Sequence, residues 1–276
     1  IKVNITDAFD NQGNTTDPNY NIGTISSLGE LVAAIENGGN YVIISDLNIS
    51  SGASTLSASL LASEPKQTII NLNGKTITVH NTASAPLITV ADGSVLTLTG
   101  DGTIIVTSDS TTAFIDNNGT INLEGGTLTT DSVAVIDNSN GTTNVNGGEP
   151  TDGAINGGAV NSVTDLINNV LTNGGELTLH EDVTFTEALM VTTTNPIIID
   201  GNGHTLTTSA TRAIRLTVGE ANVTISNLNT VVTAERIGTN DIRGISIDGN
   251  IDNVMDGDLD GFINAYLTQL ATGELK

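Results

Sequence analysis

The stretch TINLEGGTL, residues 120–128, is followed by TTNVNGGEP, residues 142–150, so one pattern begins again after 22 positions. A comparable stretch, VLTLTGDGTI, lies upstream at residues 95–104. Short strands separated by Asn, Asp and Gly turns, at a period of about 20 residues, are typical of a solenoid in which each coil pairs only with its neighbours. Asn and Gly make the corners because they accept positive φ. A two-sheet sandwich would not readily explain this short repeat.

A longer repeat spans most of the chain. NGGELTLHEDVTF, residues 173–185, repeats NGGNYVIISDLNI, residues 37–49, and each copy follows an apolar periodic stretch, SLGELVAAIENGG at 27–39 and SVTDLINNVLTNGG at 162–175. Apolar residues in these stretches recur at i, i+3, i+4 and i+7, which predicts one apolar face on a short helix. They are Leu28, Leu31, Val32 and Ile35 in the first copy and Val163, Leu166, Ile167 and Val170 in the second.

Both predicted helices carry start and stop signals. Ser27 with Glu30 predicts a capping box, and Ser162 with Asp165 predicts a weaker variant of the same start signal. Asn-Gly-Gly ends each helix, because Gly tolerates the positive φ of a helix C-terminus. Strand pairs follow in both copies, at TIINLNGKTITV (68–79) and PIIIDGNGHTLTT (196–208), so the sequence predicts two tandem modules.

The succession of an amphipathic helix, NGGxLTL, an acidic turn, an apolar strand and IIIDGNGHTLT resembles the pectate-lyase-like right-handed parallel β-helix superfamily over about residues 27–250. Within it, the chain is most similar to the non-catalytic repeats of bacterial surface proteins and of bacteriophage fibre and head-decoration proteins. The resemblance implies an all-β, right-handed parallel β-helix (solenoid) of two tandem modules, each opened by a short capping helix. The expected organisation is an extended N-terminal arm at 1–26, a first module at 27–160, a second at 161–254 and a C-terminal helix at 255–276.

Composition argues against several classes of function. The net charge of -23, from 31 acidic against 8 basic residues, repels nucleic-acid phosphates, so we expect no nucleic-acid partner. The longest apolar run, LVAAI at 31–35, is far shorter than the ~20 residues of a membrane-spanning helix, so we expect no membrane insertion. Because the chain has no Cys and no Trp, small and β-branched side chains must fill its core.

The sequence also predicts that the protein is not an enzyme. Polygalacturonases of the superfamily carry Asp-Asp, Gly-His-Gly and Arg-Ile-Lys motifs, whereas this chain has no Asp-Asp and places His204 in GNGHT. Its nearest analogue of the third motif is Arg236-Ile237-Gly238. His80, His180 and His204 all fall in or beside strand–turn corners, where a solvated or hydrogen-bonded role is the ordinary one. Asp and Glu are numerous, and the sequence does not select a catalytic pair.

The segment DGDLDGFINAYL, residues 256–267, matches the start of a calcium-binding loop. Asp256, Asp258 and Asp260 stand at positions one, three and five of that loop, and they are the candidate metal ligands of the chain. The closing acid at position twelve is replaced by Leu267. The alternative is a helix whose apolar stripe needs a partner surface on the last coil or on another subunit. The stripe consists of Phe262, Ile263, Tyr266, Leu267 and Leu270.

These observations together lead us to expect a rigid, non-enzymatic surface protein. The resemblance implies a bacteriophage head-decoration or fibre protein on the virion surface, whose N-terminal arm or C-terminal helix docks on the capsid or on another virion protein. Exposed turns would meet surface glycans, and a homo-oligomer is expected at the level of the family. Three alternatives remain: a bacterial cell-surface or extracellular adhesin, a tailspike that binds or degrades polysaccharide, and a calcium-dependent cohesion module if the loop at 256–267 binds metal. We expect no cofactor other than calcium at 256–260.

Overall fold

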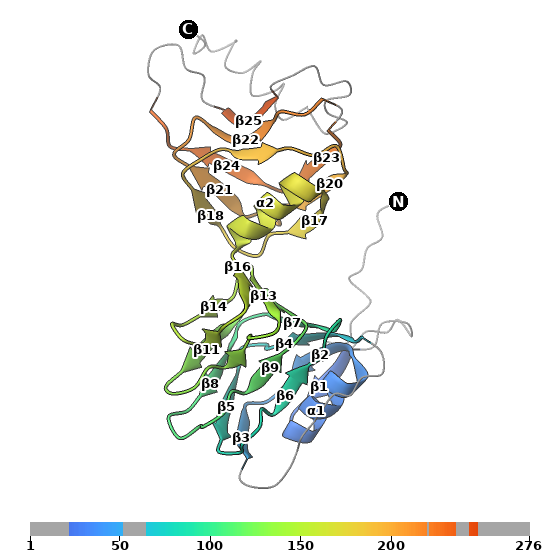
Figure 1. The fold of residues 1–276 in the computed structure, drawn as a ribbon, viewed down its shortest axis with the longest axis vertical. Helices are drawn as coiled ribbons and strands as arrows, with labels where there is room; N and C mark the ends of the chain where they lie inside the picture. The colour runs from blue at the N-terminus through green and yellow to red at the C-terminus, as the bar shows by residue number, and fades with distance from the viewer. Residues whose placement is uncertain (1–21, 52–64, 220, 236–242, 248–276) are drawn as a thin grey trace.

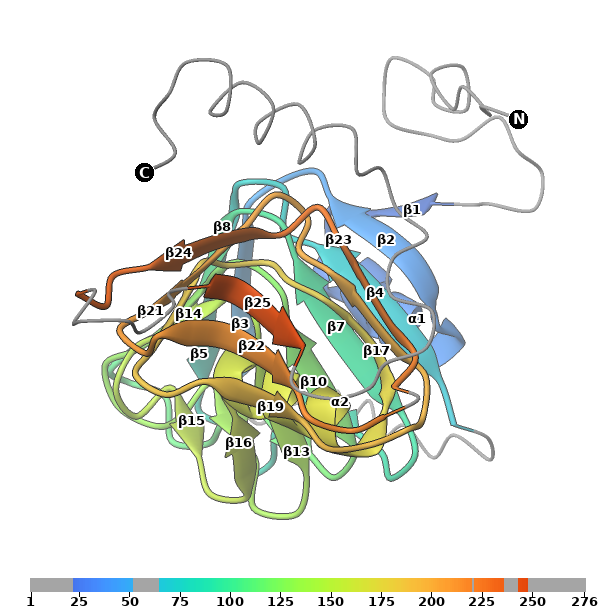
Figure 2. The same cartoon turned by 90° about the horizontal axis from the view of Figure 1, so that it is seen from above.

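The computed structural model describes residues 22–51, 65–219, 221–235 and 243–247. This part of the chain is a mostly-β parallel solenoid with two short helices, and each of its strand pairs is parallel. Successive coils stack along the longest axis of the molecule (Figure 1). Viewed along that axis, the later coils lie over the earlier ones (Figure 2).

Three sheets build the N-terminal part of the solenoid, which we call the first stack. The seven-stranded sheet has the order β1 (Ile22–Ile25), β2 (Gly39–Ile43), β4 (Gln67–Asn71), β7 (Val95–Thr99), β10 (Thr120–Leu123), β13 (Thr142–Val145) and β16 (Ala159–Asn161). The five-stranded sheet contains β14 (Glu149–Pro150), β11 (Thr127–Thr130), β8 (Gly102–Val106), β5 (Lys75–Asn81) and β3 (Leu47–Ser51). The four-stranded sheet contains β15 (Ile155–Asn156), β12 (Ile136–Asp137), β9 (Ile115–Asn117) and β6 (Ile88–Val90).

Three further sheets of three strands build the second stack. They are β17 (Gly175–Thr178), β20 (Ile197–Asp200) and β23 (Val223–Ser226); β18 (Val183–Phe185), β21 (Thr205–Thr208) and β24 (Asn229–Val232); and β19 (Leu189–Val191), β22 (Arg212–Leu216) and β25 (Arg243–Ile247). With one strand from each of three sheets counted as a turn, the described chain forms about seven complete turns, four in the first stack and three in the second. Within the same residues, no strand of one stack pairs with a strand of the other.

Apolar side chains fill the interior of both stacks, because alternate residues of each strand point inward. In the seven-stranded sheet, Ile70, Leu98 and Leu123 lie in register on neighbouring strands and are at most 3% exposed. The buried apolar residues form two separate clusters, one between positions 25 and 154 and one between 163 and 216. Each stack therefore has a core of its own, built mainly from Ile, Leu and Val.

Buried asparagines form a ladder along one corner of the first stack. Asn117 and Asn138 are fully buried, and Asn117 Nδ2 donates a hydrogen bond to Asn138 Oδ1 at 2.7 Å. Asn138 Nδ2 in turn donates to the carbonyl oxygens of Ala159 at 2.9 Å and Gly157 at 3.3 Å. Because a buried amide is stable only when its polar atoms are paired, this ladder ties three successive coils together.

Both helices form where the sequence predicts them, α1 at Leu28–Asn37 and α2 at Val163–Asn173. Each helix ends at a glycine with positive φ, 70° at Gly38 and 84° at Gly174, as Asn-Gly-Gly predicts. α1 lies at the N-terminal end of the first stack, and α2 lies between the two stacks (Figure 1). Each helix buries its apolar face against the adjoining core.

The relative quality of the two capping boxes is the reverse of the prediction. Ser162 Oγ accepts from Asp165 N at 3.2 Å and Ser162 N donates to Asp165 Oδ2 at 2.9 Å, which completes the box. Ser27 Oγ accepts from Glu30 N at 3.3 Å, but Glu30 Oε2 accepts from N and Oγ of Ser26, each at 2.7 Å. The Glu side chain is one methylene longer, so its carboxylate passes Ser27 and binds the preceding residue.

The 22-residue repeat is confirmed in the strand register, because Thr120 of β10 lies opposite Thr142 of β13. The longer repeat places β4 with β5, and β20 with β21, on the two predicted strand pairs. β1 is a strand that the sequence analysis does not predict: Ile22–Ile25, at the end of the expected arm, pairs with β2 and buries Ile25 completely. Residues 1–21 of that arm and the expected helix at 255–276 lie outside the described residues.

Candidate functional site

The junction between the two stacks determines whether they act as one rod. Asn146 directly follows β13, in the last coil of the first stack, and is 5% exposed. Its Nδ2 donates to the carbonyl oxygen of Thr178 at 2.7 Å, and its Oδ1 accepts from the backbone N–H of His180 at 3.0 Å. Because a side-chain amide carries a donor and an acceptor, Asn146 binds the second stack as a neighbouring strand would.

A glycine beside Asn146 lets the two backbones approach each other. Gly147 has a φ of 110°, and a Cβ at this position would lie 2.7 Å from both Cβ and the carbonyl oxygen of His180. The N–H of Gly147 donates to Glu181 Oε1 at 3.2 Å. α2 also contacts both stacks, because it packs against β13 and β16 on one side and against β17, β18 and β19 on the other. The junction is therefore held by backbone, side-chain and helix contacts together.

His180 also lies at this junction. Its Nε2 is 3.7 Å from Glu124 Oε2, and both side chains are 28% exposed. An ion pair of this length between partly exposed groups contributes little to stability. The hydrogen bonds of Asn146, which are shorter and are made by a buried side chain, are therefore the main polar link between the stacks.

A second histidine, His80, lies at a corner of the first stack. His80 Nδ1 is 3.2 Å from Asp109 Oδ1 and 3.0 Å from Thr107 Oγ1. The Thr107 hydroxyl, followed by His80, lowers the pKa of Asp109. A carboxyl group with a lowered pKa is a poor general acid near neutral pH, so this arrangement suits stabilisation of the turn.

The third histidine, His204, makes a similar contact in the second stack. His204 Nδ1 lies 3.2 Å from Asp182 Oδ1, and the same oxygen accepts from the backbone N–H of Thr205 at 2.9 Å. The Thr205 N–H, followed by His204, lowers the pKa of Asp182. As at His80, the carboxylate is held in its charged form by the turn that it stabilises.

Asp116 and Asp137 form a pair of carboxylates on adjacent coils, which is the kind of arrangement that a glycosidase uses. They lie opposite each other in β9 and β12, and both are half-buried. Asn118 Nδ2 donates to Asp116 Oδ2 at 2.9 Å, and Ser139 donates to Asp137 Oδ1 from its N at 3.1 Å and its Oγ at 2.6 Å. Each carboxylate is thus bound by its own turn.

This pair is not among the predicted site residues, although the sequence carries a signal for it. AFIDN at 113–117 is followed by AVIDN at 134–138, which is 21 positions later. This spacing is close to the length of one coil, so the two Asp-Asn steps fall on neighbouring strands.

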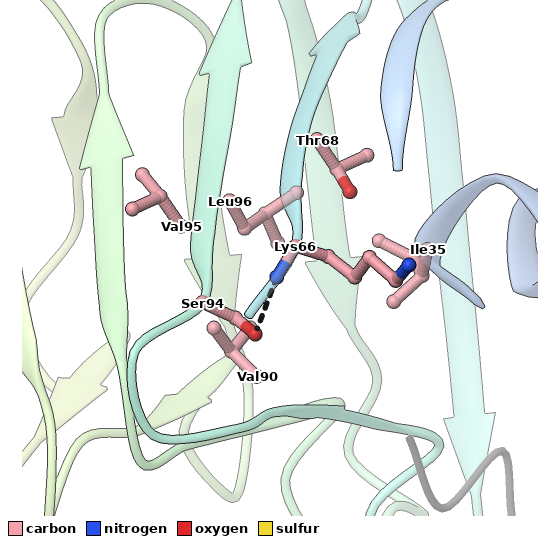
Figure 3. Close-up of a pocket in the computed structure, with 7 residues that line it drawn as sticks. All are labelled: Ile35, Lys66, Thr68, Val90, Ser94, Val95 and Leu96. Carbon is pink, nitrogen blue, oxygen red and sulfur yellow. Dashed lines mark hydrogen bonds between the residues drawn. The ribbon is translucent and has the colours of Figure 1, made fainter. Parts of the chain in front are cut away.

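The hollow shown in Figure 3 is a packing gap beside α1. Its volume is about 10 Å³, which is room for about one water molecule and far below the ~300 Å³ of a small ligand site. Lys66 N donates to Ser94 Oγ at 3.1 Å along its wall. The lining consists of Ile35, Lys66, Thr68, Val90, Ser94, Val95 and Leu96. Such a gap does not accommodate a substrate.

No three His, Cys, Asp or Glu side chains come together as a metal site within residues 22–51, 65–219, 221–235 and 243–247. The predicted calcium ligands Asp256, Asp258 and Asp260 lie outside those ranges, as does the apolar stripe at 262–270. Of the two helices described, neither has the length and apolar character needed to cross a membrane.

Comparisons with models of protein families, with curated proteins and with solved structures found no match for this chain. Its strand pairing alone places it in the class of parallel β-solenoids.

Proposed function

We propose that the protein is a rigid, non-enzymatic element of a biological surface, in which two stacks in series form one rod. The observation that carries this proposal is the junction. Asn146 is almost completely buried and makes two hydrogen bonds to the backbone of the second stack. A solenoid is a chain of nearest-neighbour contacts, so it is only as stiff as its weakest interface. A polar link through a buried side chain at that interface suits a load-carrying or spacing element.

The proposed architecture is a right-handed parallel β-helix of two tandem modules at 27–160 and 161–254. Two observations support the module division: α1 and α2 precede equivalent strands, and each stack has its own apolar cluster. Parallel strands joined within one sheet follow right-handed crossovers in nearly all proteins, which supports the handedness. An arm at 1–26 and a helix at 255–276 complete the proposed organisation.

The proposed setting is the surface of a bacteriophage virion, where the protein acts as a head-decoration or fibre protein. The arm or the C-terminal helix docks on the capsid or on another virion protein, and exposed turns meet surface glycans. The resemblance of the long repeat to phage and bacterial surface repeats supports this setting. The net charge of -23 supports it too, because carboxylates keep a β-rich surface soluble.

Imaging of purified virions and of cell envelopes, at a resolution that traces side chains, tests this proposal. We expect density for both stacks to rise from a capsid lattice, with residues 1–26 or 255–276 at the contact. If the protein is absent from particles and is recovered from cell walls or culture medium, the virion assignment is wrong and a bacterial adhesin takes its place.

A polysaccharide-degrading tailspike is the second candidate, because Asp116 and Asp137 lie opposite each other on adjacent coils. Incubation of the purified protein with bacterial surface polysaccharides tests it. Release of reducing ends that is lost in both Asp116→Asn and Asp137→Asn, but kept in the surface control Asp92→Asn, would establish catalysis and overturn the non-enzymatic proposal.

A further inference from the structure

Each end of the described solenoid presents an open sheet edge. β1 pairs only with β2 among the described strands, and β23 pairs only with β20, so each has one edge without a described neighbour. Open edges carry unpaired backbone N–H and C=O groups and are templates for pairing with another chain. The two edges belong to equivalent sheets, because β2 and β17 are the matching strands of the long repeat.

The described residues also leave the apolar interior incompletely covered at the end that carries β23. In β20, Ile197 and Ile199 are each 1% exposed. Val223 and Ile225, which follow them in register on β23, are half-buried, and Ile245 of β25 is 44% exposed. Apolar residues that are exposed in this way mark a surface that another element covers.

The two end edges lack the residues that normally prevent edge pairing. Proteins protect open edges with charged residues, Pro or bulges. β14, which is an edge of the five-stranded sheet, consists of Glu149 and Pro150 and has this protection. In contrast, β1 reads IGTI and β23 reads VTIS, with neither charge nor Pro. The chain therefore protects the edge at which the first stack ends, at the junction, and its described residues leave β1 and β23 open to pairing.

The junction inside the chain shows how one stack receives the next. β16 directly precedes α2 and pairs with β13, so a strand and a helix together cover the last coil of the first stack. β1 directly precedes α1 in the same way. The N-terminal end of the chain thus carries the same strand and helix, with no described coil before them.

We infer that β1 of one copy pairs in parallel with β23 of a second copy, so that copies join head to tail into a longer rod. If the contact between two copies keeps the parallel register of the two equivalent sheets, Ile22 lies opposite Thr224 and Thr24 lies opposite Ser226. α1 of the second copy then covers Val223 and Ile225, as α2 covers the first stack. This contact joins two different surfaces, so it extends the assembly instead of closing it. The pairing is inferred from the sheet edges, the exposed apolar side chains and the internal junction, and it stands independently of the proposed function.

Cysteine cross-linking of the full chain tests this pairing, because the natural sequence has no Cys. Thr24→Cys and Ser226→Cys place thiols on exposed outer positions of β1 and β23. Neighbouring strands lie about 4.8 Å apart, within the ~4.4 to 6.8 Å between Cα atoms that a disulfide spans. We expect a mixture of the two single variants to form disulfide-linked dimers under mild oxidation, the double variant to form a ladder of disulfide-linked oligomers, and each single variant alone to associate without forming a disulfide link.

Two results would overturn the pairing. One is a mixture that forms no disulfide-linked dimer while circular dichroism shows folded protein, which would mean that another part of the same chain covers the edges. The other is a single variant that cross-links to itself as readily as the mixture does. As a second measurement, light scattering over a roughly hundredfold range of concentration should show that Thr24→Lys weakens association. Gln67→Lys, at an exposed position of the interior strand β4, is the matched control and should not weaken association.

Discussion

Asn73 and Asn202 make the same hydrogen bond in the two stacks. Asn73 Nδ2 donates to the carbonyl oxygen of Ile43 at 3.0 Å, and Asn202 Nδ2 donates to that of Leu179 at 3.2 Å. Both residues adopt the left-handed conformation, with φ of 51° and 49°. The long repeat of the sequence is therefore kept down to single side-chain contacts, and each Asn fixes a corner to the coil before it.

The corner asparagines give the first prediction. Asn202→Ala loses the hydrogen bond to Leu179 and places a Cβ-bearing side chain without local hydrogen bonds at positive φ, which costs about 1–2 kcal/mol. Asn202→Gly loses the same bond but tolerates the conformation. We expect urea unfolding to show Ala about 1 kcal/mol less stable than Gly, and the same order at Asn73. Equal stabilities of the two variants would mean that the left-handed turn is not what these residues provide.

The junction gives the second prediction. Asn146→Ala leaves the N–H of His180 and the carbonyl oxygen of Thr178 without their buried partner, so we expect a loss of about 1–3 kcal/mol. Hydrogen exchange should become faster at 178–181 and stay unchanged in the interior of each stack. Asn173→Ala, which removes an exposed bond to Asn169 on α2, is the control and should leave exchange at 178–181 as it is. Unchanged exchange in Asn146→Ala would show that α2 and the remaining contacts hold the junction without Asn146.

The third prediction compares buried and outer asparagines of the first stack. Asn138 Oδ1 accepts from Asn117 Nδ2 at 2.7 Å and from Thr143 Oγ1 at 3.0 Å, all within the core. Asn144 donates to Asn122 at 2.9 Å on the partly exposed outer face. Water can replace a lost hydrogen-bond partner only on the outer face. Asn138→Ala should therefore lower the free energy of unfolding by about 1–3 kcal/mol, and Asn144→Ala by about 1 kcal/mol or less. Thermal or urea unfolding of the two variants checks the difference, and similar losses would contradict it.

The fourth prediction concerns the stability of the protein at low pH. Hydrogen bonds lower the pKa of several carboxyl groups, among them Asp182 through the Thr205 N–H and then His204. A pKa that is lower in the folded state contributes stability above the unfolded value of about 4, and this contribution is lost as pH falls through the folded value. Protonation also relieves the self-repulsion of the acidic chain, so only a variant isolates the effect. We expect the melting temperature of Asp182→Asn to approach that of the natural protein as pH falls below about 4. A difference in melting temperature between the two proteins that stays constant with pH would contradict this stabilisation by Asp182.

The fifth prediction separates steric contact from backbone strain. Gly158 has a φ of 61°, and a Cβ there would collide with the backbone carbonyl oxygen of Asn138. Gly203 has a φ of 85° with open space around it. Gly203→Ala should therefore lose only the strain, about 1–2 kcal/mol, and Gly158→Ala clearly more, measured by urea unfolding. If Gly158→Ala is as stable as Gly203→Ala, the last coil of the first stack relaxes freely.

Local signals explain what the sequence could predict. The periodic apolar residues and Asn-Gly-Gly place α1 and α2, and the 22-residue spacing places Thr120 opposite Thr142. Each of these depends on backbone conformation that the residues themselves favour, or on the constant length of one coil. The parallel solenoid therefore follows from the sequence.

Features that depend on distant residues or on side-chain length could not be predicted from local sequence signals. IGTI at 22–25 has no strong pattern of its own and becomes β1 because it pairs with β2. Asn146 resembles many other turn asparagines, and its role depends on residues that lie more than thirty positions further along the chain. The two capping boxes differ because Glu30 reaches Ser26 whereas Asp165 reaches Ser162, a difference of one methylene.

The register of β10 with β13 means that the length of the solenoid can change only by whole coils. Thr120 and Thr142 occupy successive rungs, so the 22 residues from 120 to 141 are one interchangeable unit of length. Duplication of that unit would raise the rod by one rung, about 4.8 Å, and its deletion would lower the rod by the same step, with both ends unchanged. Selection can therefore change the distance between the two ends of such a protein by adding or removing coils, while the surfaces at the ends stay the same.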